Sequence, residues 1–374
     1  MNNCILCRSS KLSRIYQADK DNRGLSVYIC EYCGMVQSFP RIDYISNHTP
    51  RLSSGADFGN IRYGKHFSLS NIMCVIEKFK SVFYGHNFLD VGAGNGEVAN
   101  SICDIANFKM VWAIEPDKSL VHPKNFFRGE LDRYWITRRV EDVNLPESYF
   151  SLVIMNHTLE HIKEPINVLN KIFHSIREEG IIYIEVPNLS YLMQASIVEE
   201  YFISKHINFF DINTLLKTMT TAGFEIVEFI PTSTCENIWV VGSRARMAPK
   251  VHLDSIKNMI DKYLEGRHKL NRLIRDNVVA INGDVQSGKR VAFWGAGRIF
   301  DCYVREGLNW RGLCGIIDLY LPQDKSPYPL IQDVNQVPEC DCIVISSREY
   351  ENEIRGIIQS SEIRTKVLSW KDVL

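Results

Sequence analysis

The stretch Phe88-Leu-Asp-Val-Gly-Ala-Gly-Asn-Gly-Glu-Val-Ala99 decides the fold of this chain. Its apolar beginning is typical of a buried strand, and Gly92, Gly94 and Gly96 then form a turn before a helix. Glycine accepts positive φ angles and lets a ligand approach the backbone closely. The first N–H groups of the helix have no partner within it, so they point toward the same place. The stretch therefore predicts a strand, a turn and a helix, with a ligand lying over the turn.

Two acidic residues narrow the choice of ligand. Asp90 precedes the first glycine, where it would repel a pyrophosphate but would accept a hydrogen bond from a cationic amine. The glycine spacing also differs from the G-x-G-x-x-G of dinucleotide-binding turns. Glu115 ends the next apolar run about twenty residues after the glycines, which is the spacing of an acid that binds both hydroxyls of a ribose. The two acids together suit S-adenosylmethionine.

The same residues resemble the first motif of the class I S-adenosylmethionine-dependent methyltransferases, which has the form D-x-G-x-G-x-G. The resemblance implies a Rossmann-like α/β domain that binds S-adenosylmethionine through the glycine turn, with Glu115 on the ribose. It also implies an acid near the adenine amine, for which Glu141 and Asp142 are the candidates. A pair of solvated loop carboxylates would explain these two residues as well.

Strand-like and helix-like segments alternate along the middle of the chain. The expected strands are 87–91, 110–114, 152–155, 181–186, 224–229 and 238–241, and the expected helices are 66–83, 98–105, 165–176 and 212–222. This alternation predicts a doubly wound parallel sheet with right-handed crossovers, whose ligand lies at the carboxyl ends of the strands. Asn156 and His157 follow the fourth strand, so we expect them beside the cofactor.

Four cysteines near the amino terminus form two C-x-x-C pairs, Cys4 with Cys7 and Cys30 with Cys33. The residues between the two pairs are strand-like. Each pair can occupy two corners of a tetrahedral ion, so the pattern predicts a zinc ribbon with a structural Zn²⁺ and no open coordination position. The alternatives are a redox pair, which usually occurs singly, and unliganded cysteines in a core.

The rest of the chain is expected to form a helical linker and a third unit. Residues 248–288 carry apolar residues at helical spacing up to Arg275, which favours a helix that bridges two domains over one that binds a partner. Lys289 begins a second Rossmann-like unit with a glycine turn at Gly295. The sixth position of a dinucleotide fingerprint is Phe300 there, which disfavours NAD. The expected domains are a zinc ribbon at 1–55, the methyltransferase unit with its leading helix at 56–247, the linker at 248–288 and the Rossmann-like unit at 289–374.

The composition of the chain argues against nucleic-acid binding, membrane insertion and secretion. The 374 residues carry a formal net charge of −1 and are 45% hydrophobic, so ordinary buried cores are expected and nucleic acid is not expected as a partner. No apolar run reaches the length of about eighteen residues that spans a membrane, and the amino terminus does not resemble a signal peptide. We therefore expect a cytoplasmic protein whose 11 cysteines are reduced or metal-bound. The sequence does not indicate the oligomeric state.

The order of the units extends the resemblance. A four-cysteine zinc unit, a class I methyltransferase unit and a small Rossmann-like unit resemble, over nearly the whole chain, the C-methyltransferases of nucleotide-linked 4-keto deoxysugars. In that family a histidine after the fourth strand and a Glu-His pair after the fifth line the sugar site. The resemblance implies these places for His161 and His206, with Lys205 where the family has glutamate. It further implies a catalytic tyrosine in the segment between the zinc-binding cysteines and the cofactor turn, either Tyr63 or Tyr44.

The resemblance implies a reaction through an enolate. His206 would remove the proton beside the ketone, and Lys205 or a tyrosine would stabilise the enolate oxygen before methyl transfer. Three alternatives stay open. The acceptor atom can be an oxygen or nitrogen of another sugar or small metabolite, the last unit can be a scaffold that binds NAD or a nucleotide sugar, and either histidine can be a structural residue.

Overall fold

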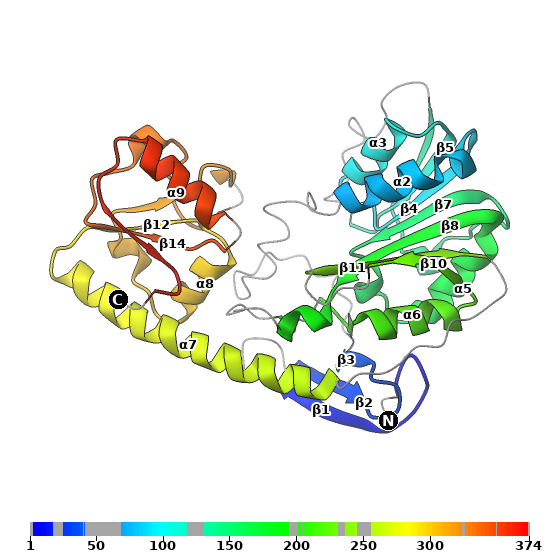
Figure 1. Ribbon diagram of the computed structural model, residues 1–374, viewed down its shortest axis with the longest axis horizontal. Coiled ribbons are helices and arrows are strands. Elements are labelled where there is room, and N and C mark those ends of the chain that lie inside the picture. The colour runs from blue at the N-terminus through cyan, green and yellow to red at the C-terminus, as the bar shows by residue number, and fades with distance from the viewer. Residues whose placement is uncertain are drawn as a thin grey trace. The chain divides into compact units, whose positions relative to one another are not determined.

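The computed structural model describes residues 3–17, 25–39, 41, 69–117, 131–193, 201–203, 205–230, 236–244, 256–323, 326–348 and 350–372 (Figure 1). These residues form two compact units. The first comprises the described residues up to Ile260 apart from 201–203, and the second comprises 201–203 and the described residues from Asp261 onward. Within this described part of the chain, no helix has both the length and the apolar character needed to cross a membrane.

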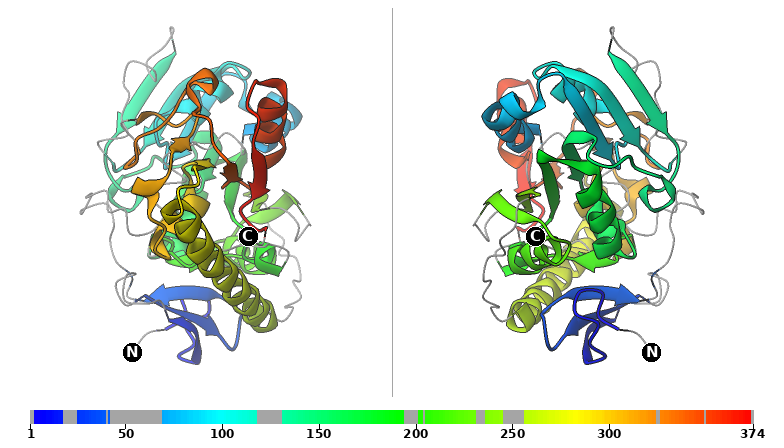
Figure 2. Two further views of the ribbon diagram at one scale, coloured as in Figure 1. Left: turned by 90° about the vertical axis from the view of Figure 1, so that its left-hand side faces the viewer. Right: turned by 90° about the vertical axis from the view of Figure 1, so that its right-hand side faces the viewer.

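A seven-stranded sheet forms the centre of the first unit, in the order β10-β11-β8-β7-β4-β5-β6 (Figures 1 and 2). Its strands are β4 (His86–Val91), β5 (Phe108–Ile114), β6 (Asp132–Ile136), β7 (Phe150–Asn156), β8 (Ile176–Pro187), β10 (Glu225–Phe229) and β11 (Asn237–Ser243). All neighbours pair in parallel except β11, which runs antiparallel to both β8 and β10. The chain order switches direction between β4 and β7, and doubly wound sheets bind ligands outside the carboxyl ends of the strands at such a point.

Helices cover both faces of this sheet. The helices of one face are α2 (Leu69–Phe83) and α3 (Glu97–Cys103), and those of the other are α5 (Pro165–Ser175) and α6 (Ile212–Thr221). Ile76 of α2 and Ile172 of α5 are buried against opposite faces, and burial of each such side chain contributes about 1.5–3 kcal/mol. Because helices cover it on both sides, β7 is buried at every position and its sequence is almost wholly apolar.

A four-stranded antiparallel sheet carries the cysteine pairs. Its strands, in spatial order, are β1 (Leu12–Gln17), β2 (Ser26–Cys30), β3 (Val36–Phe39) and β9 (Asn208–Phe209). The first three belong to the amino-terminal ribbon, whereas β9 belongs to the segment that follows β8. Val36 pairs with Phe209, and Gln37 pairs with Asn208. The ribbon therefore shares a sheet with a segment of the methyltransferase-like part of the chain.

Asn208 joins this shared strand to the end of β7. Its Nδ2 donates to the carbonyl oxygens of Leu159 (3.3 Å) and Ile162 (2.7 Å), which lie in and just after the 3₁₀ turn η5 (Leu159–His161). Its Oδ1 accepts a hydrogen bond from the guanidinium of Arg41 (2.8 Å). The Asn208 side chain is buried, so water cannot replace these bonds.

The second unit contains a parallel sheet in the order β13-β12-β14-β15. Helix α7 (Ile256–Gln286) belongs to this unit from Asp261 onward. The other elements are β12 (Val291–Trp294), α8 (Arg298–Arg305), β13 (Gly315–Ile317), β14 (Cys342–Ile345), α9 (Glu351–Ser360) and β15 (Lys366–Ser369). At the end of β12, Gly295 has a φ of +105°, and a Cβ there would lie 3.3 Å from the backbone of Ser346. The next N–H, that of Ala296, donates to the Asp318 carboxylate that follows β13 (3.0 Å).

The predicted fold class is confirmed: a Rossmann-like α/β sheet, an amino-terminal four-cysteine unit and a carboxyl-terminal parallel sheet are all present. The domain limits stay predictions. Strand β6 was not expected, because it is an edge strand of exposed and half-buried residues without a continuous apolar run. The helix expected to end at Arg275 continues to Gln286, because Val278 and Ile281 maintain the apolar spacing and pack into the core of the second unit.

We expect Asn208→Ala to destabilise the first unit. The change removes the side-chain donor to the carbonyl group of Ile162, and a buried group left unsatisfied costs about 1–3 kcal/mol, whereas the carbonyl group of Leu159 keeps the N–H of Ile162. Urea unfolding should therefore show an earlier transition than for Asn107→Ala, a matched change at an exposed position. Equal transitions for the two variants would contradict the assignment of Asn208 as a joint between the ribbon strand and η5.

Candidate active site and metal site

The glycine turn lies where the loops after β4 and β7 meet. Gly92 has a φ of +73°, and a Cβ there would lie 2.1 Å from Oγ1 of Thr158, which donates to the carbonyl oxygen of Val91 (3.0 Å). Gly94 has a φ of +58°, but no described atom apart from its chain neighbours lies within 4 Å of its Cβ position. Gly96 (φ +80°) precedes α3. Packing thus requires glycine at 92, whereas Gly94 leaves open space beside the backbone for a ligand.

Two buried acids lie beside this turn, as predicted. Glu115 follows β5, where its Oε2 accepts from the N–H of Gly94 (2.9 Å) and its Oε1 accepts from the N–H of Asp117 (2.8 Å). A carboxylate has about four lone-pair sites, so it can accept several hydrogen bonds at once. Asp90 lies on the adjacent strand β4, next to the switch point, and is buried. The open backbone at Gly94 and these two acids fit S-adenosylmethionine.

Glu141 and Asp142 lie in the 3₁₀ turn η4 (Val140–Asp142) after β6. Lys171 of α5 holds this turn through its ammonium, which donates to the carbonyl oxygens of Val140 (3.1 Å), Glu141 (2.6 Å) and Val143 (3.1 Å). The backbone is therefore fixed, while the side chain of Glu141 is half-buried and that of Asp142 is exposed. The predicted contact of either acid with the adenine amine stays a prediction.

His161 and His206 meet from two separate loops. Their ring centroids lie 4.9 Å apart, with His161 in η5 after β7 and His206 two residues before β9. Nδ1 of His161 lies 2.8 Å from the backbone carbonyl oxygen of Lys205. Because a carbonyl oxygen only accepts, Nδ1 donates this hydrogen bond. The structure thus brings the two predicted histidines together, and Lys205 takes part through its backbone. The predicted Tyr63 and its alternative Tyr44 lie outside the described residues.

The ribbon holds the segment that carries His206. The Ser38 hydroxyl of β3 donates to the backbone oxygen of His206 (3.1 Å), and the Ser38 N–H donates to that of Ile207 (3.0 Å). The N–H of Ile207 in turn donates to the backbone oxygen of Glu160 (2.9 Å). The backbone around His206 is therefore fixed from the ribbon on one side and from η5 on the other.

Two buried acids near these histidines were not predicted. Glu160 is 1% exposed and Glu185 is 0% exposed. His157 lies between them, with Nδ1 3.5 Å from Oε1 of Glu160 and Nε2 3.8 Å from Oε1 of Glu185. Its φ of +49° is unusual for a residue other than glycine. The signal for Glu185 was present in the sequence, because it is an acid inside the otherwise apolar run of residues 181–186. The predicted cofactor contacts of His157 and of the buried Asn156 stay predictions.

Glu160 is an anion in this setting. Burial raises the pKa of its carboxyl group, but the positive charges of His161 and His157, together with that of His206, outweigh burial and lower the pKa to about 2. Nε2 of His161 lies 3.8 Å from Oε1 of Glu160. One candidate ligand atom from each of Glu160, His161 and His206 lies within 4.8 Å of the other two.

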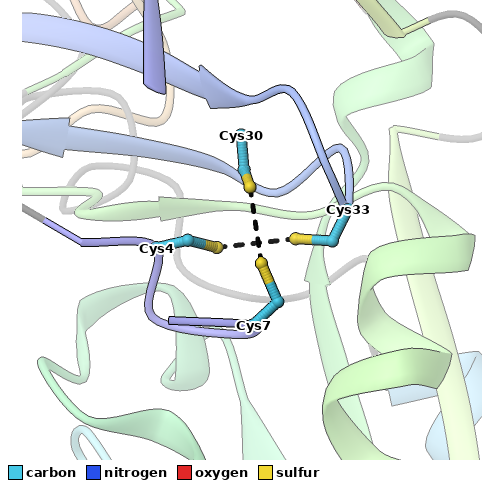
Figure 3. Close-up of side chains that lie close together, drawn as sticks. All are labelled: Cys4, Cys7, Cys30 and Cys33. Atoms are coloured by element: carbon cyan, nitrogen blue, oxygen red, sulfur yellow. Dashed lines mark hydrogen bonds between the residues drawn. The ribbon is translucent and has the colours of Figure 1, made fainter. Parts of the chain in front are cut away.

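The four predicted zinc ligands converge on one point (Figure 3). The sulfur of Cys4 lies 3.5 Å from that of Cys33, and the sulfur of Cys7 lies 3.5 Å from that of Cys30. Zn–S bonds of about 2.3 Å place the sulfurs of a tetrahedral site about 3.8 Å apart, so the set fits zinc. Contact with Cys33 lowers the pKa of the Cys4 thiol, which favours the thiolate that a metal needs.

Each C-x-x-C pair is held by a turn of the same shape. The N–H of Arg8 donates to the carbonyl oxygen of Cys4 (2.9 Å), and the N–H of Gly34 donates to that of Cys30 (2.9 Å). Arg8 (φ +62°) and Gly34 (φ +77°) both have left-handed backbones. These two turns direct the paired sulfurs inward. Because the chain supplies all four corners of the tetrahedron, an ion held here would be structural.

Comparison with known proteins identifies the central part of the chain. Residues 65–229 match the family described as a methyltransferase domain. No curated protein matches the chain. Similar solved structures include an S-adenosylmethionine-dependent methyltransferase from Aquifex aeolicus, which is 14% identical over 51% of this chain and 99% of its own, with a TM-score of 0.40. The enzyme from Clostridium acetobutylicum is 14% identical over 45% of this chain and 88% of its own, with a TM-score of 0.40. The enzyme from Mesorhizobium loti is 11% identical over 43% of this chain and 92% of its own, with a TM-score of 0.37. Residues 65–229 therefore form a methyltransferase domain, and S-adenosylmethionine is the cofactor that this family implies.

Gly92→Ala and Gly94→Ala should have different effects. Both positions have positive φ, which costs alanine about 1–2 kcal/mol, but only at Gly92 does the new methyl group also collide with Thr158. We expect Gly92→Ala to lower the thermal unfolding temperature further. Gly94→Ala should keep the fold and weaken the binding of S-adenosylhomocysteine at least tenfold in calorimetry. Equal losses of stability, or an unchanged affinity in Gly94→Ala, would contradict the roles assigned to the two glycines.

Removal of the ribbon metal should loosen the segment around His206. After chelation, we expect diethylpyrocarbonate to modify His206 at least five times faster, because β3 no longer holds the backbone of this segment. Exposed His174 on α5 is the control, and its rate should stay constant. The affinity for S-adenosylhomocysteine should change less than twofold, since β4, β5 and Thr158 hold the glycine turn. A constant rate at His206 after complete zinc loss would disprove this coupling.

Proposed function

We propose that this methyltransferase methylates a carbon atom of a nucleotide-linked 4-keto deoxysugar through an enolate. The observation that carries the proposal is the meeting of His161 and His206 beside the carboxyl ends of β7 and β8. Methylation at carbon needs a base that removes a C–H proton, and a ketone makes the neighbouring C–H acidic enough for imidazole. A histidine titrates near neutral pH, so it can take this proton and release it again.

In the proposed reaction His206 takes the proton from the carbon next to the ketone, and the electron pair moves onto the carbonyl oxygen. His161 has its Nδ1 fixed by Lys205, so its ring holds a defined orientation beside His206. The side chain of Lys205 is the candidate that stabilises the enolate oxygen. Bound S-adenosylmethionine supplies a methyl group on positively charged sulfur, which accepts the electrons of the breaking C–S bond as the new C–C bond forms. The proton on His206 then leaves to solvent.

The carboxyl-terminal unit has the features of a nucleotide-binding fold, considered by itself. Its strand order has a switch point between β12 and β14, and the glycine turn after β12 lies there. The Asp318 carboxylate holds this turn and the following loop by accepting from the N–H groups of Ala296 (3.0 Å) and Leu321 (3.0 Å). Phe300 is buried against Phe293 of β12 (ring centroids 5.2 Å apart), which agrees with the argument against a dinucleotide.

Lys205 favours a second candidate, because the sugar methyltransferases that this chain resembles have glutamate at that position. Transfer of the methyl group to an oxygen or nitrogen of another sugar or small metabolite also needs a base. His161 suits this reaction, since Nδ1 fixes its ring and its side chain is 41% exposed. The two candidates differ in one respect: only the carbon reaction requires a C–H proton to leave before methyl transfer.

Solvent exchange separates the two candidates. The protein is incubated in D₂O with a panel of nucleotide-linked 4-keto deoxysugars, without S-adenosylmethionine, and deuterium incorporation is followed by mass spectrometry. We expect incorporation beside the ketone, at least a hundredfold slower in His206→Asn and unchanged in His174→Asn, a matched change at an exposed histidine. Methylation at oxygen or nitrogen without any exchange would contradict carbon methylation and support the second candidate.

A further inference from the structure

We propose that Glu160 is the positioning carboxylate of this active site, a buried carboxylate that acts on the reaction through His161 and His206. The inference rests on the proposed carbon methylation. It assigns to Glu160 the place beside the catalytic histidine that the sugar methyltransferases give to a glutamate, where this chain has Lys205. In this chain Glu160, from the loop after β7, thereby takes the role that the sugar methyltransferases give to a glutamate in the loop after β8.

Burial defines how Glu160 can act. Its side chain is 2% exposed, so it cannot reach a bound sugar. His161 is 41% exposed and lies 3.8 Å away through Nε2. A carboxylate that is buried behind an accessible imidazole influences the reaction only through that imidazole. Glu160 is therefore a positioning residue rather than a catalytic one.

Backbone hydrogen bonds hold Glu160 close to both His161 and His206. It is the middle residue of η5, and its carbonyl oxygen accepts the N–H of Ile207, the residue after His206. His161, the next residue in η5, is anchored in turn to the carbonyl oxygen of Lys205, the residue before His206. These two hydrogen bonds bracket His206, so the carboxylate and both rings keep a fixed geometry.

Titratable groups surround Glu160 on several sides. His157 contacts it from the same loop, and His161 and His206 face it from η5 and the segment before β9. On the other side of His157 lies Glu185 of β8, whose carboxylate accepts a hydrogen bond from the Tyr183 hydroxyl. Burial and Glu185 raise the pKa of Tyr183, so this hydroxyl stays neutral. His157 thus lies between two buried carboxylates, and His161 and His206 adjoin the carboxylate of Glu160.

The buried carboxylate of Glu160 suits the proposed reaction. The proton that leaves the sugar carbon moves onto His206, and the resulting imidazolium lies beside an anion that is already in place. No bond to Glu160 forms or breaks, and the proton leaves to solvent after methyl transfer. The buried anion therefore strengthens the base without contacting the substrate.

Glu160→Gln tests the inference, because it keeps the shape of the side chain and removes its charge. Deuterium exchange into the 4-keto sugar is measured against pH for the full-length zinc-loaded protein. We expect the rate at pH 7 to fall at least tenfold and the apparent pKa of the rate profile to fall by about one unit. Glu179→Gln, at an exposed position on β8, is the control and should match the wild type. A role in folding alone would lower stability and leave the pKa of the profile unchanged, which would overturn the inference.

Two further variants keep the test decisive if Glu160→Gln folds poorly. Glu160→Asp keeps the charge, so its profile should keep a pKa closer to the wild-type value than that of the glutamine variant. The double variant Glu160→Gln/Lys205→Glu returns an acid to the place that the family uses, and we expect it to recover at least a third of the lost rate. Failure of the double variant to recover any rate would overturn the proposed exchange of positions.

The remaining outcomes separate this inference from the proposed function. A wild-type protein that exchanges deuterium, with an identical rate and profile in Glu160→Gln, overturns only the role of Glu160. A wild-type protein that methylates oxygen without exchange overturns the proposed function. Metal analysis adds a third outcome, because Glu160, His161 and His206 also have the spacing of metal ligands. A second metal ion per chain that is lost in Glu160→Gln and required for exchange would overturn the positioning role.

Discussion

The pairing of the two-residue strand β9 with β3 is the constraint on which the candidate active site depends. It joins the four-cysteine ribbon to the segment that carries His206, and Asn208 and Ile207 connect the same segment to η5. A ribbon of this size cannot bury enough apolar surface to fold well alone, and an ion held by the four cysteines would supply free energy for its folding. The position of His206, the proposed base, therefore depends on the ribbon.

The two Rossmann-like sheets of this chain use the same device at their first turn. In the first, Glu115 accepts the N–H of Gly94, and in the second, Asp318 accepts the N–H of Ala296. In both, the acid follows the second strand and holds the glycine turn that follows the first. An acid at this position thus has a structural role even before a ribose binds. The sequence pattern of strand, glycine turn, strand and acid indicates the turn with more certainty than it indicates the ligand.

Local sequence explains the fold well and the active site only in part. The glycines, the apolar runs and the cysteine pairs predicted the sheet of the first unit, its cofactor turn and the four sulfurs, because each signal lies within a few residues of its partner in sequence. The contact of His161 with His206 followed from the family resemblance, since nothing local relates two residues from separate loops. Strand β9 carried no signal, because two residues have no periodicity and the partner β3 lies far away in the sequence.

Amide hydrogen exchange of residues 205–210, with zinc bound and after chelation, tests most directly whether the ribbon holds the active-site segment. The N–H groups of Ile207 and Ser38 bond across the junction between the ribbon and η5, while that of Gly92 bonds within the larger sheet, to the carbonyl oxygen of Ile114. We predict that chelation removes the protection of Ile207 and Ser38 and leaves that of Gly92 unchanged. Full protection of Ile207 in a protein shown to contain no zinc would contradict the account.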